Sequence, residues 1–165
     1  MTNSPSERQR TAVMLRPLQE EDAQTSYGWR NDARIWQYTG NRPDKVVTEA
    51  MERDWLRQVL ARPNEARFAI CVGAQHTYVG NVQLTHITAG DAEFHIFIGD
   101  TRVHGQGVGT QATQLILDYA RETLGLHEVY LSVHQDNLAA IRTYEKCGFI
   151  CRASDGDRLT FFRKL

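Results

Sequence analysis

The sequence predicts an α/β domain in which a mixed sheet carries helices on both faces. Three strand-like segments in the middle of the chain are separated only by short turns, and the later strand-like segments alternate with helical ones. The chain has 165 residues, of which 41% are hydrophobic and 24% charged, and these values are typical of one globular domain. We expect residues 1–10 to form a flexible polar tail and residues 11–165 to form a single domain.

The charge balance and the composition exclude several classes of protein. Nineteen basic and twenty acidic residues give a net charge of −1, whereas a nucleic-acid-binding protein needs a basic excess. No apolar run approaches the length of a membrane-spanning helix, and the first residues lack the apolar stretch of a signal peptide. Three cysteines are too few, and odd in number, for a disulfide framework. We therefore expect a cytoplasmic protein with neither nucleic-acid nor membrane partners.

The N-terminal part predicts one strand and two helices. Thr11–Leu15 is a short β-prone run, which we expect Pro17 to stop. Glu20–Arg30 is predicted as a helix because three acidic residues suit its N-terminus. After a break at residues 41–44, apolar residues recur at helical spacing and predict a second helix that ends near Pro63. These apolar positions are Val47, Met51, Trp55, Leu56, Val59 and Leu60.

The rest of the chain predicts six strands and two helices. Three strand-like runs predict an antiparallel meander: Ala66–Val72, Tyr78–Ile87 and Ala92–Ile98. A glycine-rich loop then leads into a helix with apolar residues at positions 112, 115, 116, 119 and 120. The last segments are predicted as strand, helix, strand and strand: Glu128–His134, Leu138–Lys146, Phe149–Arg152 and Leu159–Arg163.

The glycine-rich loop predicts a site for a diphosphate. Glycines allow successive backbone N–H groups to converge on one point, and the following helix adds about half a positive charge there. The spacing differs from the dinucleotide-binding pattern, because Thr110 stands where that pattern has its third glycine, and no Gly-Lys-Ser/Thr follows as in a P-loop. A flexible turn that is only incidentally glycine-rich remains an alternative. The loop reads His104, Gly105, Gln106, Gly107, Val108, Gly109, Thr110.

A second motif follows twenty-eight residues after Gly109. It begins at Asn137 and ends in Tyr144-Glu145-Lys146-Cys147-Gly148-Phe149. Together the two motifs resemble the GNAT superfamily of N-acetyltransferases, in which an R/Q-x-x-G-x-G/A loop precedes N-x-x-A-x-x-x-Y-E-K-x-G-F. His104 departs from the usual Arg or Gln, but backbone amides do most of the phosphate binding. The resemblance implies a GNAT fold, with six to seven strands splayed between the fourth and fifth.

The resemblance also implies an acetyl-CoA-dependent N-acetyltransferase, with acetyl-CoA as co-substrate and no metal. The coenzyme's diphosphate would bind the amides of residues 104–109, with a further contact from the Thr110 hydroxyl. Its pantetheine arm would lie in the splay, bonded like an added strand. An amide near Ile98 would polarise the thioester carbonyl. Asn137 suits a helix N-cap, and the resemblance adds contact with the pantetheine arm.

The resemblance makes Tyr144 the acid that protonates the departing thiolate, for which a phenol with a pKa near 10 is suitable. Helical spacing also allows Tyr144 to be only a core residue. An alkylamine is only ~0.04% unprotonated at pH 7, so a base is expected as well. Glu93 is the first candidate, His95 on the same strand face is the second, and His134 is the third. Each could instead be an ordinary polar strand residue, and some family members use no side-chain base.

The resemblance implies that the first two helices and the loop between them form the pocket for the acetyl acceptor. The candidate substrate-binding residues there are Trp29, Arg30, Asn31 and Trp36. Aromatic rings and arginines suit an amino sugar or a sugar nucleotide, although two tryptophans in amphipathic helices can also be core. The alternatives are a protein N-terminus of the ribosomal-protein type, a polyamine, which would need an acidic pocket, and a coenzyme A-binding sensor without activity. We expect direct transfer to a primary amine in a ternary complex, and a homodimer.

Overall fold

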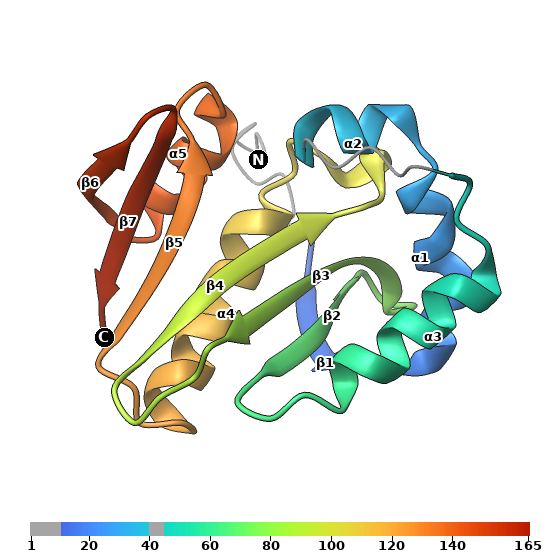
Figure 1. Ribbon diagram of the computed structural model, residues 1–165, viewed down its shortest axis with the longest axis horizontal. Helices are drawn as coiled ribbons and strands as arrows, with labels where there is room; N and C mark the ends of the chain where they lie inside the picture. Colours follow the sequence, from blue (N-terminus) through green and yellow to red (C-terminus); the bar gives the residue numbers. More distant parts are fainter. Residues whose placement is uncertain (1–10, 40–44) are drawn as a thin grey trace, which may run out of the picture.

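The chain forms a seven-stranded mixed sheet with helices on both faces, as predicted (Figure 1). A computed structural model describes residues 11–39 and 45–165, so the predicted tail at 1–10 and the predicted break at 41–44 lie outside the described residues. The strands are β1 (Val13–Pro17), β2 (Ala66–Val72), β3 (Thr77–Thr85), β4 (Asp91–Ile98), β5 (Glu128–His134), β6 (Ile150–Asp155) and β7 (Arg158–Lys164). The helices are α1 (Ala23–Arg30), α2 (Ala33–Thr39), α3 (Glu49–Leu60), α4 (Val108–Glu122) and α5 (Leu138–Lys146), with 3₁₀ turns at Glu20–Asp22 and Thr101–Val103.

The predicted bounds of β2, β5 and α5 are confirmed residue for residue, whereas one prediction is wrong and one helix was not predicted. Pro17 does not stop the first strand but is its last residue, paired with Phe68. A proline is tolerated there because β1 lies at the edge of the sheet. The helix that was not predicted is α2. Its signal was Asp32, whose carboxylate accepts a hydrogen bond from the Arg34 amide at the start of the helix.

The strand order is β1-β2-β3-β4-β5-β7-β6, and the first four strands form the predicted antiparallel meander. The β4 and β5 strands are parallel but pair only between Asp91–Glu93 and Glu128–Tyr130. Beyond these residues β4 continues to Ile98 and β5 to His134 without a mutual pairing, and Figure 1 shows them diverging. The expected splay between the fourth and fifth strands is therefore present.

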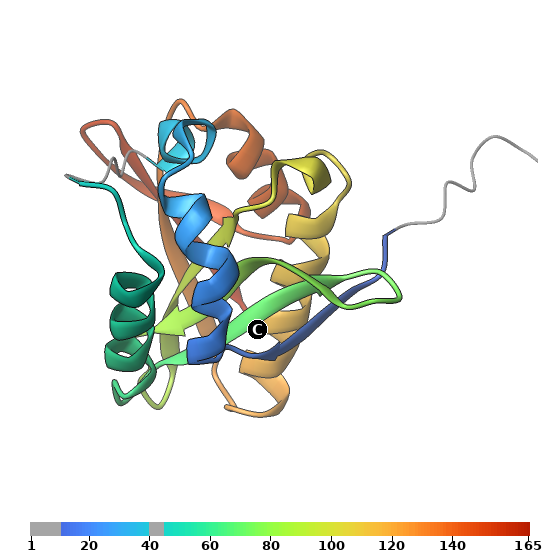
Figure 2. The same cartoon turned by 90° about the vertical axis from the view of Figure 1, so that its right-hand side faces the viewer.

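The two faces of the sheet have separate cores. Figure 2 shows α1 and α3 on one side of the sheet and α4 on the other. Strand β2 alternates between them, because Ala69 and Cys71 pack toward α1 and α3 whereas Ile70 packs toward α4. Leu56 of α3 and Ile116 of α4 are both fully buried, and each contributes about 1.5–3 kcal/mol through burial. No helix in the described part of the chain is long and apolar enough to cross a bilayer.

Candidate active site

The glycine-rich loop presents free backbone amides at the start of α4. Gly105 and Gly107 have φ of 76° and 77°, a left-handed conformation that glycine adopts without strain, and Gly107 is the N-cap of α4. The first helical hydrogen bond of α4 is donated by the Gln111 amide to the Gly107 carbonyl, 3.1 Å away. The amides of Val108, Gly109 and Thr110 precede it and have no intrahelical acceptor. This arrangement fits the predicted diphosphate.

Side chains of the loop bond to the protein itself. His104 Nε2 lies 3.1 Å from the Ile98 carbonyl oxygen and so connects the loop to the end of β4. The Gln106 amide donates to the Arg102 carbonyl at 3.0 Å and accepts from the Thr11 hydroxyl at 3.0 Å. These bonds hold the loop in shape and leave the binding of an anion to its backbone.

The splay exposes backbone groups of β4. The Gly99 amide donates to the Val79 carbonyl at 2.8 Å, and antiparallel pairing alternates from there along β3 and β4. The peptide groups of Phe94, Ile96 and Ile98 therefore face away from β3, toward the splay. The parallel pairing of Glu93 with Tyr130 uses the Phe94 N–H, and the Ile98 carbonyl lies next to His104 Nε2. The Phe94 carbonyl, both backbone groups of Ile96 and the Ile98 N–H can bond an extended chain in the manner of an added strand.

The position of Ile98 separates it from the predicted base. Five residues divide Ile98 from Glu93 along β4, a distance of about 16 Å at the rise of a strand. The Ile98 amide and the Glu93 carboxylate therefore cannot both contact one reacting centre. Ile96 presents an amide with the same orientation closer to Glu93, beyond the last residues that pair β4 with β5.

Tyr144 lies against the closed end of the splay, where β4 and β5 begin to diverge. Its ring packs edge-on against Phe94, with centroids 5.9 Å apart, and lies 5.9 Å from the ring of Phe149. Burial raises the pKa of Tyr144 to about 12, so the phenol keeps its proton at neutral pH. The ring thus belongs to the core, as one interpretation predicted, and the side chain also retains the proton that an acid needs.

Glu93 and His95 meet on the opposite face of β4. Glu93 Oε1 lies 3.4 Å from His95 Nε2, and Glu93 Oε2 lies 3.3 Å from His86 Nδ1. The Thr85 hydroxyl lies 3.2 Å from both imidazoles. Burial lowers the pKa of His95 and outweighs the opposing charge of Glu93, while the charge of Arg67 lowers it further. His95 therefore favours its neutral form.

The sequence analysis missed His86 and Thr85. Neither belongs to a motif, and His86 follows β3 at a φ of 50°. They reach Glu93 because Thr85 and Glu93 are partners in the β3–β4 pairing, which local sequence does not reveal.

His134 does not join this cluster. It lies four residues beyond Tyr130, the partner of Glu93, which is about 13 Å along a diverging strand. Its Nε2 lies 3.0 Å from the Asp157 carboxylate, and its Nδ1 accepts a hydrogen bond from the Asp136 amide at 3.1 Å. The two ring nitrogens are thus engaged by two different turns, one between β5 and α5 and the other between β6 and β7.

Asn137 is the N-cap of α5, as predicted. Its side chain accepts a hydrogen bond from the Ala140 amide at 3.3 Å. This bond positions the helix that carries Tyr144. Contact between Asn137 and a pantetheine arm stays a prediction.

The predicted acceptor residues hold the helices of this face in place. Trp29 is 9% exposed and packs against Tyr78 and Phe97, with ring centroids 4.8 and 5.9 Å away. Trp36 on α2 is half-buried. Contact of either tryptophan with substrate stays a prediction, and the structure shows a packing role for Trp29.

Arg30 and Asn31 are engaged in contacts within the protein. Arg30 Nε lies 3.0 Å from the buried Glu52 carboxylate, and its guanidinium lies 4.3 Å from the centre of the Trp55 ring. The Asn31 side chain bonds both the amide and the carbonyl of Val47, at 2.8 and 2.7 Å. These contacts connect α1 to α3 and to the segment before it.

Neither covalent nor metal chemistry finds support in the described residues. Burial raises the pKa of the Cys71 and Cys147 thiols, so neither is an activated nucleophile, and Cys151 is exposed. Among residues 11–39 and 45–165, no group of three or more His, Cys, Asp or Glu side chains could hold a metal ion.

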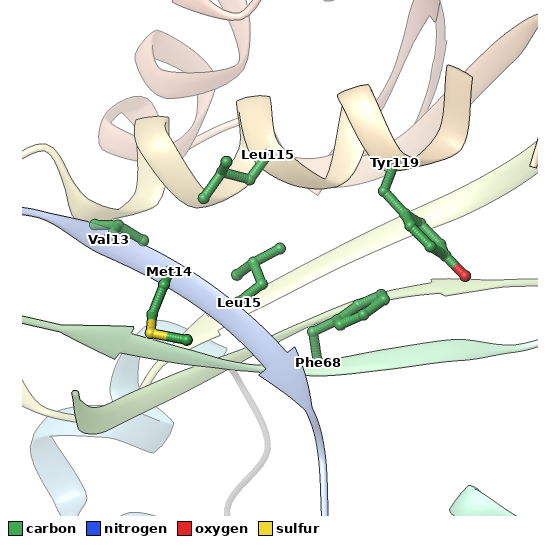
Figure 3. A pocket seen from close by; sticks show the side chains of 6 residues that line it. All are labelled: Val13, Met14, Leu15, Phe68, Leu115 and Tyr119. Carbon is green, nitrogen blue, oxygen red and sulfur yellow. The ribbon is translucent and has the colours of Figure 1, made fainter. Parts of the chain in front are cut away.

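An apolar cavity lies at the far edge of the sheet, between β1 and α4 (Figure 3). It has a volume of about 350 Å³. Its lining residues are Val13, Met14, Leu15, Phe68, Leu115 and Tyr119. The cavity contains none of the predicted site residues.

Comparisons with known proteins agree with the motifs. A family model described as an acetyltransferase (GNAT) domain matches residues 12–150. The chain is 32% identical over 139 residues to the spermidine N(1)-acetyltransferase of Escherichia coli (strain K12), covering 84% of this chain and 73% of that protein. It is 30% identical over 140 residues to the corresponding enzyme of Vibrio cholerae, covering 84% and 79%. A crystal structure of the Vibrio cholerae enzyme with CoA and spermine superimposes with a TM-score of 0.79 and 26% identity, covering 92% of this chain and 95% of that one.

Proposed function

Because this chain belongs to the GNAT family of acetyltransferases, we propose that it transfers an acetyl group from acetyl-CoA to a primary amine of a polyamine. The observation that carries the proposal is the likeness to two spermidine acetyltransferases, at 32% and 30% identity over most of this chain. The relatives favour a polyamine over the amino sugar that the sequence analysis preferred.

Coenzyme A fits the residues that would bind it. The amides of Val108, Gly109 and Thr110 lack intrahelical partners and suit a diphosphate, and the coenzyme then supplies a thioester as the acetyl donor. The pantetheine arm would bond the peptide groups of β4 that face the splay. In this arrangement Ile98 contacts the arm near the phosphates, and the amide of Ile96 polarises the thioester carbonyl.

Tyr144 and Glu93 flank the end of the splay from opposite faces of the sheet. Tyr144 packs against Phe94 and keeps its proton, so it can protonate the departing thiolate. Glu93 faces the side of α1 and α3 and accepts a proton from the amine. The leaving group and the nucleophile thus meet separate groups.

The charge near Glu93 suits a cationic acceptor. Burial raises the pKa of Tyr130, and the negative charges of Glu93 and Asp91 raise it further. Two carboxylates therefore act on the same hydroxyl at the closed end of the splay. A polyamine carries several ammonium groups and gains more from such a field than an amino sugar, which carries one.

The experiment is a panel of acceptors with acetyl-CoA, in which released coenzyme A is measured and the product is identified by mass spectrometry. We expect the highest kcat/KM with spermidine or spermine. A higher value with glucosamine or with a peptide N-terminus would contradict the polyamine. Coenzyme A binding without turnover of any amine would indicate a sensor.

The role of Glu93 is tested with Glu93→Gln. We expect a loss of kcat/KM that is larger at pH 7 than at pH 9.5, because more of the amine is already unprotonated at the higher pH. An equal loss at both pH values would contradict a base at this position. The homodimer also stays a prediction, and light scattering tests it.

A further inference from the structure

Four side chains meet at the closed end of the splay: Thr85, His86, Glu93 and His95. The Glu93 carboxylate lies close to both imidazoles, at 3.3 Å from His86 Nδ1 and 3.4 Å from His95 Nε2. The Thr85 hydroxyl lies between the two rings at 3.2 Å from each. If Glu93 takes a proton from each amine, it must lose that proton before the next turnover.

Exposure increases from Glu93 toward His86. The Glu93 side chain is 25% exposed and the His95 side chain 45%, whereas the His86 side chain is 74% exposed. His86 therefore lies between the half-buried carboxylate and bulk water. Its protonated form keeps most of its hydration, so a transient charge there costs little.

The charged groups around Glu93 favour His86 over His95 as the next proton acceptor. From β4, Asp91 and His95 act on this region, and from β5 so does Tyr130. From β2, Arg67 lies near His95 and is paired with Glu65 at 2.8 Å. Burial and the Arg67 charge both lower the pKa of His95, which disfavours an imidazolium at that position.

We propose that His86 relays the proton of the acceptor amine from Glu93 to solvent. The proposal rests on the proposed function, in which Glu93 is the base. The protonated Glu93 carboxyl gives its proton to Nδ1 of neutral His86, and the imidazolium then releases its Nε2 proton to water. The net result is a carboxylate again, one hydrated proton and a neutral imidazole in the Nδ1–H tautomer, which proton exchange with water returns to the Nε2–H tautomer before the next turnover. His86 does not contact the reacting atoms: it acts through Glu93, from which it takes the proton, and is therefore a positioning residue.

The backbone at His86 suggests a variant that tests the relay cleanly. His86 has a φ of 50°, and His76, an exposed residue of the β2–β3 turn, has a φ of 52°. Asparagine adopts this left-handed conformation more readily than most residues. His86→Asn therefore removes the titrating ring with little backbone strain, and His76→Asn is a matched control.

The experiment measures kcat with the best acceptor in a weakly buffered solution at pH 7. We expect His86→Asn to lower kcat about tenfold, less than the roughly 10²–10⁴ of a group that contacts the reacting atoms. Added imidazole should restore much of the loss, and the solvent deuterium isotope effect on kcat should rise. His76→Asn should behave as the wild type does. Coenzyme A affinity should be unchanged in both variants.

Two outcomes would overturn the relay. If kcat of His86→Asn equals the wild-type value while Glu93→Gln is slow, the proposed function stands and the relay is wrong. If kcat falls and imidazole restores nothing, His86 has only a structural role. Inactivity of the wild type toward every amine would overturn the proposed function, and the relay with it.

Discussion

The two ends of the splay are built from different parts of the polypeptide. The open end, at Ile98 and the glycine-rich loop, offers backbone amides, while side chains such as Gln106 bond within the protein. The closed end offers side chains from three elements: Thr85 from β3, Glu93 from β4 and Tyr144 from α5. One end therefore depends on backbone conformation, and the other depends on side-chain identity.

This difference separates binding from chemistry. Amides that bind an anion are present whatever side chain the residue carries, so substitutions act there mainly by changing φ. Acids and bases lose their function when one titrating atom is removed. Variants at the open end should therefore change affinity for coenzyme A, and variants at the closed end should change turnover.

The largest effect is expected at Tyr144. Tyr144→Phe removes the proton donor and keeps the ring between Phe94 and Phe149, so kcat should fall roughly 10²–10⁴-fold with coenzyme A affinity unchanged. Steady-state kinetics and calorimetric titration check both parts. Tyr119→Phe is the control, because Tyr119 is on α4 beside the apolar cavity at the other edge of the sheet, and kcat should not change. Equal losses in the two variants would contradict the assignment.

The second largest effect is expected on stability, at the contact between Gly99 and Trp29 beside the open end of the splay. A Cβ atom at Gly99 would overlap the Trp29 ring, so Gly99→Ala should lower the free energy of unfolding by about 1–3 kcal/mol. Gly28→Ala on α1 is the control: a Cβ there meets nothing within 4 Å, and it should stabilise the helix by about 0.5–1 kcal/mol. Urea unfolding measures both. A neutral Gly99→Ala would mean that α1 moves freely relative to β4.

A moderate effect is expected in the loop itself. Gly107 has open space around it and a φ of 77°, so the demand for glycine is conformational. Gly107→Val should cost about 1–2 kcal/mol in that conformation and weaken coenzyme A binding about tenfold, with kcat at saturation nearly unchanged. Gly107→Asn, which tolerates a positive φ, should bind more tightly than Gly107→Val. Equal affinity of the wild type and Gly107→Val would show that the loop conformation is irrelevant.

The smallest effect concerns stability against pH. The pKa of His95 is lowered in the folded state, so below about pH 6.5 the unfolded chain binds more protons at this residue. This contribution to stability is present above pH 6.5 and is lost as the pH falls toward the folded-state pKa. His95→Gln should therefore lose less stability between pH 7.5 and 5 than the wild type, as measured by urea unfolding. His76→Gln, at an exposed residue of the β2–β3 turn, is the control for loss of a histidine, and an identical slope in all three proteins would be the contrary result.

Features that depend on neighbouring residues could be predicted from the sequence. Periodicity and turn residues were sufficient for β2, β5 and α5, and the cap at Asn137 follows from the preference of an amide side chain for the first turn of a helix. The glycine-rich loop was predictable because positive φ and free amides at a helix start are properties of a few consecutive residues.

Contacts between segments that are distant in the sequence could not be predicted from it. His86 joins Glu93 only through the β3–β4 register, and Arg30 is paired with Glu52 only because α1 packs on α3. His134 is a candidate base from the sequence because it lies on β5, the strand parallel to β4. In the structure β5 diverges from β4 beyond Tyr130, so His134 lies away from Glu93 and contacts Asp157 instead.

The sequence by itself determined the class of fold, the glycine-rich loop at the start of α4 and the helix that carries Tyr144, because each depends on neighbouring residues. The tertiary structure decided which polar side chains gather beside the splay and which of the predicted acceptor residues are buried instead. The physical reason is that strand register and helix packing minimise the free energy of the whole chain, and no short segment contains that information.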